Sequence, residues 1–196
     1  MILKMWDRSS PPKTFPDGYH AAAGYVGGDT PTPWSRTDWG RVGQAGLRAL
    51  PIWVRSNPAG HTEGLDDGTR FAEALGLLGV PDGCPVVLDR ETSVDYSYVQ
   101  AFTFELGRWG RTRLVEYGSD ENLFVGAGQP YGYWPADPTG YLHWNPVDWP
   151  GHTTWPPGVH AVQCIWANVD TSVIGGRFYD LLWQPSAALA AEEVAS

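Results

Sequence analysis

Two carboxylates, Asp89 and Glu91, stand two positions apart directly after a short apolar run, and this spacing could do chemistry. The run at 86–88 predicts the end of a strand that is covered on both faces. Side chains two apart along a strand point the same way, so we expect the two carboxylates to lie a few ångströms apart. Since carboxylates that close cannot both ionise readily, the pKa of one rises and it can act as a general acid.

A general acid beside an ionised carboxylate is the pair that cleavage of a glycosidic bond needs. One group protonates the leaving oxygen and the other supports the oxocarbenium-like transition state. Because the Asp-x-Glu signal is short, an alternative stays open: either residue could be a loop carboxylate that pairs with Arg90 or caps the next helix. Two more acids at predicted strand ends, Asp7 and Asp170, favour a site over this alternative.

The elements that must position these acids alternate between strands and helices. The pattern predicts strands at 2–6, 21–26, 47–54, 85–88 and 113–117, with helices over 36–45, 66–78 and 94–109. We expect Ser35 to cap the first of these helices and Asp66 or Asp67 to cap the second. After residue 118 the sequence predicts strands at 131–134, 160–166 and 170–174, with at most short helices at 119–124 and 178–183.

This order predicts an α/β fold, an irregular TIM-like (β/α) barrel with about five β/α units followed by about three strands with few helices. We expect one domain over 1–185 and a C-terminal tail over 186–196 that frays. In such barrels functional groups gather at the carboxyl ends of the strands. The polar and aromatic residues expected there to bind substrate are Tyr25, Trp53, Arg55, Tyr117, Trp134 and Gln163.

Two of these assignments have open alternatives. Arg55 could instead form an ion pair with a loop acid. Trp134 begins a region rich in Trp, Tyr and Pro, which also holds Tyr141, Trp144, Trp149 and Trp155. These rings could stack on sugars or could pin a long loop onto the barrel.

Composition excludes several classes of partner. The net charge of −9 argues against nucleic acid and against an anionic membrane surface. No apolar run approaches the roughly 20 residues of a membrane span. The first residues are too short and polar a stretch for a secretory signal. We therefore expect a product that is cytoplasmic as made or exported by other means, and one carried on a phage virion or released at lysis would also fit. The spacing of His and Cys predicts no metal, and we expect no cofactor.

Six short motifs together resemble the family 25 glycoside hydrolases, lysozymes that cut bacterial peptidoglycan. They resemble even more the related glycoside-hydrolase-like domains of unknown function found in actinobacterial proteins and their phages. The matching positions are Asp7, Tyr-Val-Gly-Gly at 25–28, 51–54, 87–91, 117–119, and 162–163 followed by 169–170. The resemblance spans nearly the whole chain, and its specificity lies in the order of these motifs.

The resemblance implies an irregular barrel of five β/α units plus extra strands. It also implies that Glu91 is the proton donor and that Asp89, Asp7 and Asp170 support it. In that family the acetamido group of the substrate is often proposed as the internal nucleophile, which Asp89 would orient.

Two hypotheses about function follow. The first is a hydrolase acting on bacterial cell-wall glycan, either peptidoglycan or an envelope polysaccharide, with Glu91 as the acid. The second is a glycan-binding or structural module without catalysis, such as a phage tail or virion component with an assembly partner. A metal-dependent hydrolase that uses the acidic cluster is a distant third.

Overall fold

The computed structural model describes residues 3–57, 60–90, 95–118, 132–135, 161–166 and 169–190. Within the last three ranges, side chains are described for Trp134 and from Ser172 onward. The strands are β1 (Leu3–Asp7), β2 (Ala21–Gly28), β3 (Arg48–Val54), β4 (Val86–Asp89), β5 (Leu114–Gly118), β6 (Gly132–Pro135), β7 (Ala161–Trp166) and β8 (Val169–Ile174). The helices are α1 (Arg36–Gln44), α2 (His61–Leu78), α3 (Tyr96–Arg108), α5 (Gly176–Tyr179) and the 3-10 helix η2 (Ala187–Ala190).

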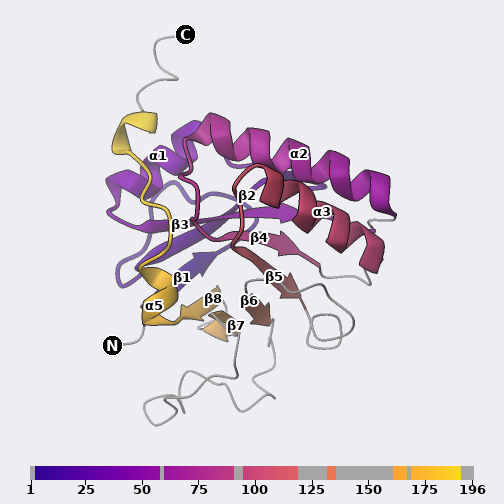
Figure 1. The fold of residues 1–196 in the computed structure, drawn as a ribbon. Helices are drawn as coiled ribbons and strands as arrows, with labels where there is room; N and C mark the ends of the chain where they lie inside the picture. Colours follow the sequence, from indigo (N-terminus) through magenta and orange to yellow (C-terminus); the bar gives the residue numbers. More distant parts are fainter. Residues whose placement is uncertain are drawn as a thin grey trace.

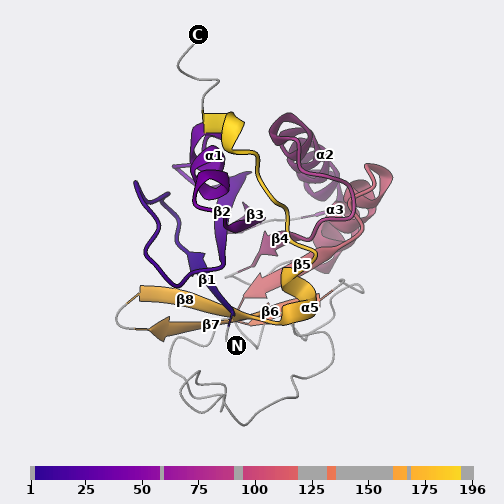
Figure 2. The same cartoon turned by 90° about the vertical axis from the view of Figure 1, so that its left-hand side faces the viewer.

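The strands form one sheet in the order β6-β5-β4-β3-β2-β1-β8-β7. Neighbours from β1 to β6 are parallel, whereas β8 is antiparallel to both β1 and β7. The sheet curls, because β6 and β7 stand at opposite ends of this order and yet contact each other. Helices α1, α2 and α3 lie on one side of the curl (Figure 1), and β6, β7 and β8 lie on the side away from them (Figure 2).

The predicted mixed α/β class is confirmed, but a complete TIM-like barrel is not. Hydrogen-bonded ladders connect the strands only in the order given, so within the described residues none joins β6 to β7. Helices α1, α2 and α3 follow β2, β3 and β4, whereas residues 8–20 after β1 contain no helix. The described chain therefore shows three β/α units where we expected about five.

Two apolar layers hold the sheet. The concave interior contains apolar side chains of the strands, among them Met5, Ala23, Leu50, Ile52, Val87 and Val115. The layer between the sheet and the helices is more aromatic and includes Trp39, Trp53, Phe71, Leu88 and Phe102. Alternate residues of one strand enter different layers, as the two-residue period of a strand requires.

Local signals explain some boundaries and miss others. Ser35 caps α1 as predicted, and its hydroxyl and the Asp38 side chain form a reciprocal capping box. Helix α2 begins at His61, five residues before the predicted capping acid Asp66. The other predicted capping residue, Asp67, is buried inside that helix and forms an ion pair with Arg55. The closing helix α5 also comes earlier than we predicted.

The segment after residue 185, which we expected to fray, begins with a short helix. Residues 187–190 form η2, which contacts α1, and Leu189 is buried there. Residues 191–196 lie outside the described part of the chain.

Candidate functional site

Asp89 is a buried carboxylate at the last position of β4, with an exposed fraction of 1%. The Tyr25 hydroxyl on β2 donates a hydrogen bond to Asp89 Oδ2 at 2.9 Å. Tyr117 on β5 is paired with Asp89 in the register of the sheet. Three neighbouring parallel strands therefore bring these residues together near their carboxyl ends.

Asp7 ends β1 and is also buried. The indole Nε1–H of Trp134 donates to Ser172 Oγ at 3.1 Å, and the Ser172 hydroxyl donates to Asp7 Oδ2 at 3.4 Å. Trp134 also packs against Tyr117, with 4.7 Å between the ring centroids. This chain of contacts crosses the interior from β6 to β8 and β1, which are not neighbours of β6 in the sheet.

We call these six side chains the inner cluster: Asp7, Tyr25, Asp89, Tyr117, Trp134 and Ser172. They lie on the concave side of the sheet, because Tyr25, Tyr117 and Trp134 pack with the interior apolar layer. The cluster combines two buried carboxylates with hydroxyl and indole donors. Such donors orient a carboxylate and favour its ionised form, which can then stabilise positive charge that develops on a substrate.

Three predicted site residues lie partly or wholly beyond the described residues. Glu91 follows the described end of β4 at Arg90 and lies outside them. Gln163 and Asp170 lie on β7 and β8, but their side chains are not described. The register Trp6↔Thr171 places the next backbone positions, Asp7 and Asp170, at the same end of β1 and β8. The aromatic residues at 141–155 lie outside the described residues.

Arg90 turns to the helix-facing side of β4 and forms a buried ion pair with Glu116 of β5. Burial raises the pKa of the Glu116 carboxyl above its usual value, and the nearby Arg90 guanidinium opposes this shift. The sequence predicted no role for Glu116, whose one signal was an acid between apolar neighbours near the end of a predicted strand.

Trp53 and Arg55, which we expected to bind substrate, lie on the helix-facing side of β3. Trp53 is buried against Phe71 of α2, with 5.5 Å between the ring centroids. Arg55 pairs with Asp29 at 2.6 Å, with Asp67 at 2.9 Å and with Glu63. The open alternative for Arg55, an ion pair with a loop acid, therefore describes its position.

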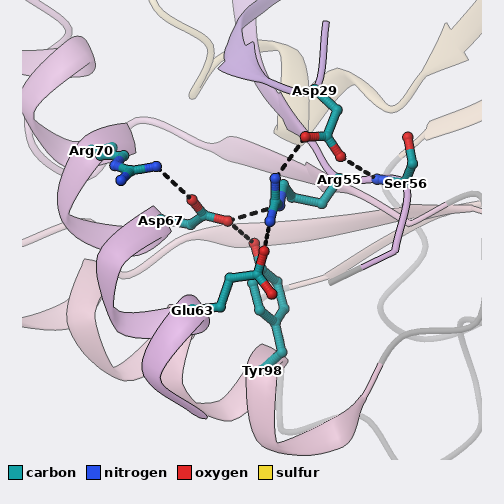
Figure 3. Close-up of polar contacts among 7 residues, drawn as sticks. All are labelled: Asp29, Arg55, Ser56, Glu63, Asp67, Arg70 and Tyr98. Carbon is teal, nitrogen blue, oxygen red and sulfur yellow. Dashed lines mark hydrogen bonds and ion pairs between the residues drawn. The ribbon is translucent and has the colours of Figure 1, made fainter. Parts of the chain in front are cut away.

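The carboxylates around Arg55 have further partners (Figure 3). Asp67 accepts a hydrogen bond from the Tyr98 hydroxyl at 3.0 Å and lies 3.7 Å from Arg70. Asp29 accepts one from the backbone N–H of Ser56 at 2.9 Å. We call this group of seven residues the Arg55 network: Asp29, Arg55, Ser56, Glu63, Asp67, Arg70 and Tyr98.

The glycines of the Tyr-Val-Gly-Gly motif have a structural explanation. The register between β2 and β3 shifts between Tyr25 and Gly27. A Cβ atom on Gly27 would lie 2.5 Å from the Trp53 ring, and one on Gly28 would lie 1.9 Å from the carbonyl oxygen of Val54. Gly28 also has a φ of +90°, which favours glycine. The two glycines thus let β2 approach β3 closely just after Tyr25.

The described residues contain no group of three or more His, Cys, Asp or Glu side chains arranged to hold a metal ion.

Ser172 is the member of the inner cluster that sequence reasoning missed. Its position two residues after Asp170 on a strand was the available signal, because that spacing puts both side chains on one face.

No helix among the described residues is long and apolar enough to cross a membrane.

No protein family and no curated protein matches this sequence, but solved structures match its fold. An uncharacterized protein of B. stearothermophilus aligns with a TM-score of 0.71 and 18% identity over 92% of this chain and 100% of its own. A glycosyl hydrolase 25 of Streptococcus pneumoniae, the virulence factor GHIP, aligns with a TM-score of 0.67 and 13% identity over 93% and 94% of the two chains.

A third match is the modular autolysin LytC of Streptococcus pneumoniae, solved in complex with a synthetic peptidoglycan ligand. It aligns with a TM-score of 0.64 and 11% identity, over 88% of this chain and 46% of LytC. At these identities the likeness shows the fold alone. The fold of this chain is therefore similar to that of the family 25 glycosyl hydrolases, as the sequence motifs implied, while an actinobacterial or phage source stays a prediction.

Proposed function

We propose that this chain is a glycoside hydrolase of bacterial cell-envelope glycan and that the inner cluster is part of its active site. The observation that carries the proposal is Asp89, a buried carboxylate held by Tyr25 at the carboxyl end of β4. It occurs in a fold similar to that of a glycosyl hydrolase 25. The peptidoglycan ligand of LytC makes peptidoglycan the first substrate to test.

In this proposal Glu91 donates the proton to the leaving oxygen. Asp89 orients the acetamido group of the sugar, while Asp7 and Asp170 stabilise the positive charge that develops at the reacting carbon. Gln163 contributes to substrate binding, and the curled sheet closes as an irregular barrel around the site. Tyr117 and Trp134 support the cluster from inside; Trp134 is almost fully buried and presents little surface for stacking on a sugar.

The decisive experiment is Glu91→Gln with purified peptidoglycan as substrate and release of reducing ends as the measurement. Loss of a general acid should lower kcat about 100-fold or more while glycan binding is retained. Glu73→Gln is the matched control, because Glu73 is exposed on α2 and the same change there should leave turnover intact. Unchanged turnover in Glu91→Gln would refute the assigned role.

A binding measurement with the same glycan separates the two hypotheses. Binding without product in the wild-type protein, unaffected by Glu91→Gln, would indicate a glycan-binding or structural module. Mass measurement in solution or with virions would then test for an assembly partner. Cleavage that survives a chelator would exclude the metal-dependent alternative.

A further inference from the structure

The ion pair between Arg90 and Glu116 connects two residues that each directly follow or precede a member of the inner cluster. Arg90 follows Asp89 on β4, and Glu116 precedes Tyr117 on β5. Their exposed fractions are 4% and 1%. Both charged groups are thus removed from water, so they interact more strongly than a surface pair would.

The backbone around this pair is tied to the same two residues. Asp89 and Tyr117 are paired in the register of β4 and β5. The backbone N–H of Arg90 donates to the carbonyl oxygen of Tyr117 at 2.8 Å. On the other side of β4, the N–H of Arg55 donates to the carbonyl oxygen of Asp89 at 3.5 Å.

The alternation of side chains along a strand places the pair behind the cluster. Tyr117 packs in the interior and Asp89 reaches Tyr25 there, so Arg90 and Glu116 face the helix side. Each strand end therefore has one side chain in the inner cluster and the next one in the ion pair. A rotation of either strand end would have to break the ion pair.

We propose that Arg90 and Glu116 are positioning residues, and that their ion pair fixes the orientation of Asp89 relative to Tyr117 for the reaction proposed above. This inference rests on the proposed function. The pair does not touch substrate and acts through the backbone of β4 and β5. Its role is distinct from a contribution to stability, since a well-packed apolar pair often stabilises a buried site as well as an ion pair does.

That property supplies the test. The double variant Arg90→Met with Glu116→Met replaces the charges by side chains of comparable length and should fold with a thermal midpoint near that of the wild type. If the pair positions Asp89, kcat in this variant falls about 10- to 100-fold, because small displacements of reacting groups are costly. KM changes much less. If the pair serves stability alone, a double variant with a wild-type thermal midpoint also has a wild-type kcat, and that result overturns the proposal.

A matched control comes from α3, where Arg108 Nη1 and Glu105 Oε2 lie 2.8 Å apart and Glu105 is buried. The same double replacement, Arg108→Met with Glu105→Met, should leave kcat within about twofold, because neither residue contacts the inner cluster. The charge-swapped variant, Arg90→Glu with Glu116→Arg, should recover part of the lost kcat. The single variants Arg90→Met and Glu116→Met each leave one buried charge without its partner. If both fail to fold, the double variants still test the proposal.

A second readout keeps this inference separate from the proposed function. Carbon-detected NMR of the Asp89 carboxyl gives its chemical shifts without any turnover. The Arg90→Met with Glu116→Met variant should change these shifts, and the α3 control should leave them unchanged. If the wild type cleaves no glycan but the shifts change, the proposed function fails and the positioning role stands. If the shifts stay at wild-type values, the positioning role fails whatever the activity.

Discussion

The inner cluster and the Arg55 network lie on opposite sides of the sheet near the same strand ends, and each holds buried carboxylates. In the Arg55 network one guanidinium contacts three carboxylates, so positive charge offsets negative charge. In the inner cluster Tyr25 and Ser172 donate hydroxyl hydrogens to Asp89 and Asp7. A hydroxyl orients a carboxylate without adding an opposing charge, whereas a guanidinium both orients it and offsets its charge.

The largest effect that this comparison predicts is on stability. Arg55→Ala should lower the free energy of unfolding by about 3 kcal/mol, because it leaves the buried carboxylate of Asp67 without its closest cation. Turnover of glycan should change less than about twofold if it is measured well below the unfolding temperature. Urea denaturation and initial rates test this. Arg70→Ala is the control, since Arg70 is exposed and lies 3.7 Å from Asp67.

Tyr25→Phe should show the opposite pattern. The change removes one hydrogen bond to Asp89 and should cost about 1 kcal/mol of stability. It should lower kcat about tenfold, because Asp89 loses the donor that orients it. The exposed Tyr96→Phe on α3 gives the baseline for loss of a phenolic hydroxyl. A rate in Tyr25→Phe equal to that of Tyr96→Phe would contradict a functional inner cluster.

Ser172→Ala should be milder, because its link to Asp7 is long at 3.4 Å. We expect a loss of about 1 kcal/mol, largely because the buried Trp134 indole N–H loses its acceptor. Asp7 loses a donor that orients it, so kcat should fall about threefold. The exposed Ser10→Ala should leave both quantities unchanged. A kcat equal to that of Ser10→Ala would separate Ser172 from the function of Asp7.

The smallest expected effect is a pH dependence of the free energy of unfolding that Glu116 causes. Burial raises its pKa in the folded protein, so above the ordinary value of about 4.3 the folded state keeps a proton that the unfolded state has lost. Stability from this group should therefore fall as the pH rises through that window. The difference in unfolding free energy between the wild type and Arg90→Met with Glu116→Met should decrease from pH 4 to pH 7. A difference that increases over that range would contradict the raised pKa.

The parts of this structure that sequence predicted well are those with local causes. Apolar runs located the eight strands that the described residues form, and the Ser35 cap located the start of α1. The start of α2 was missed because helix-breaking glycines obscured it. Gly64 lies so close to α3 that a Cβ atom there would come 2.4 Å from the carbonyl oxygen of Tyr98. Tertiary packing therefore requires glycine at a position where helix propensity disfavours it.

The face of the sheet on which a side chain lies was harder to predict than the positions of the strands. Trp53 and Arg55 share one face of β3, and we placed that face toward the substrate. Strand β3 is apolar on both faces, so its sequence does not show which residues turn inward, and an error of one position exchanges the two faces. The positions of Asp7 and Asp89 were easier to predict. The carboxyl ends of parallel strands lie at the same edge of the sheet, whichever way the side chains turn.

The neighbouring positions of β1 and β8 have a consequence for how the protein is made. Asp7 and Ser172 contact each other across 165 positions of sequence. On the ribosome β1 is synthesised long before β8, and its β8-facing edge stays unpaired by β8 until that strand has emerged. Contacts of such long range slow folding and leave strand edges open to wrong partners meanwhile. The inner cluster is therefore assembled late, and a nascent chain stalled before β8 would have its first carboxylate without the residue that orients it.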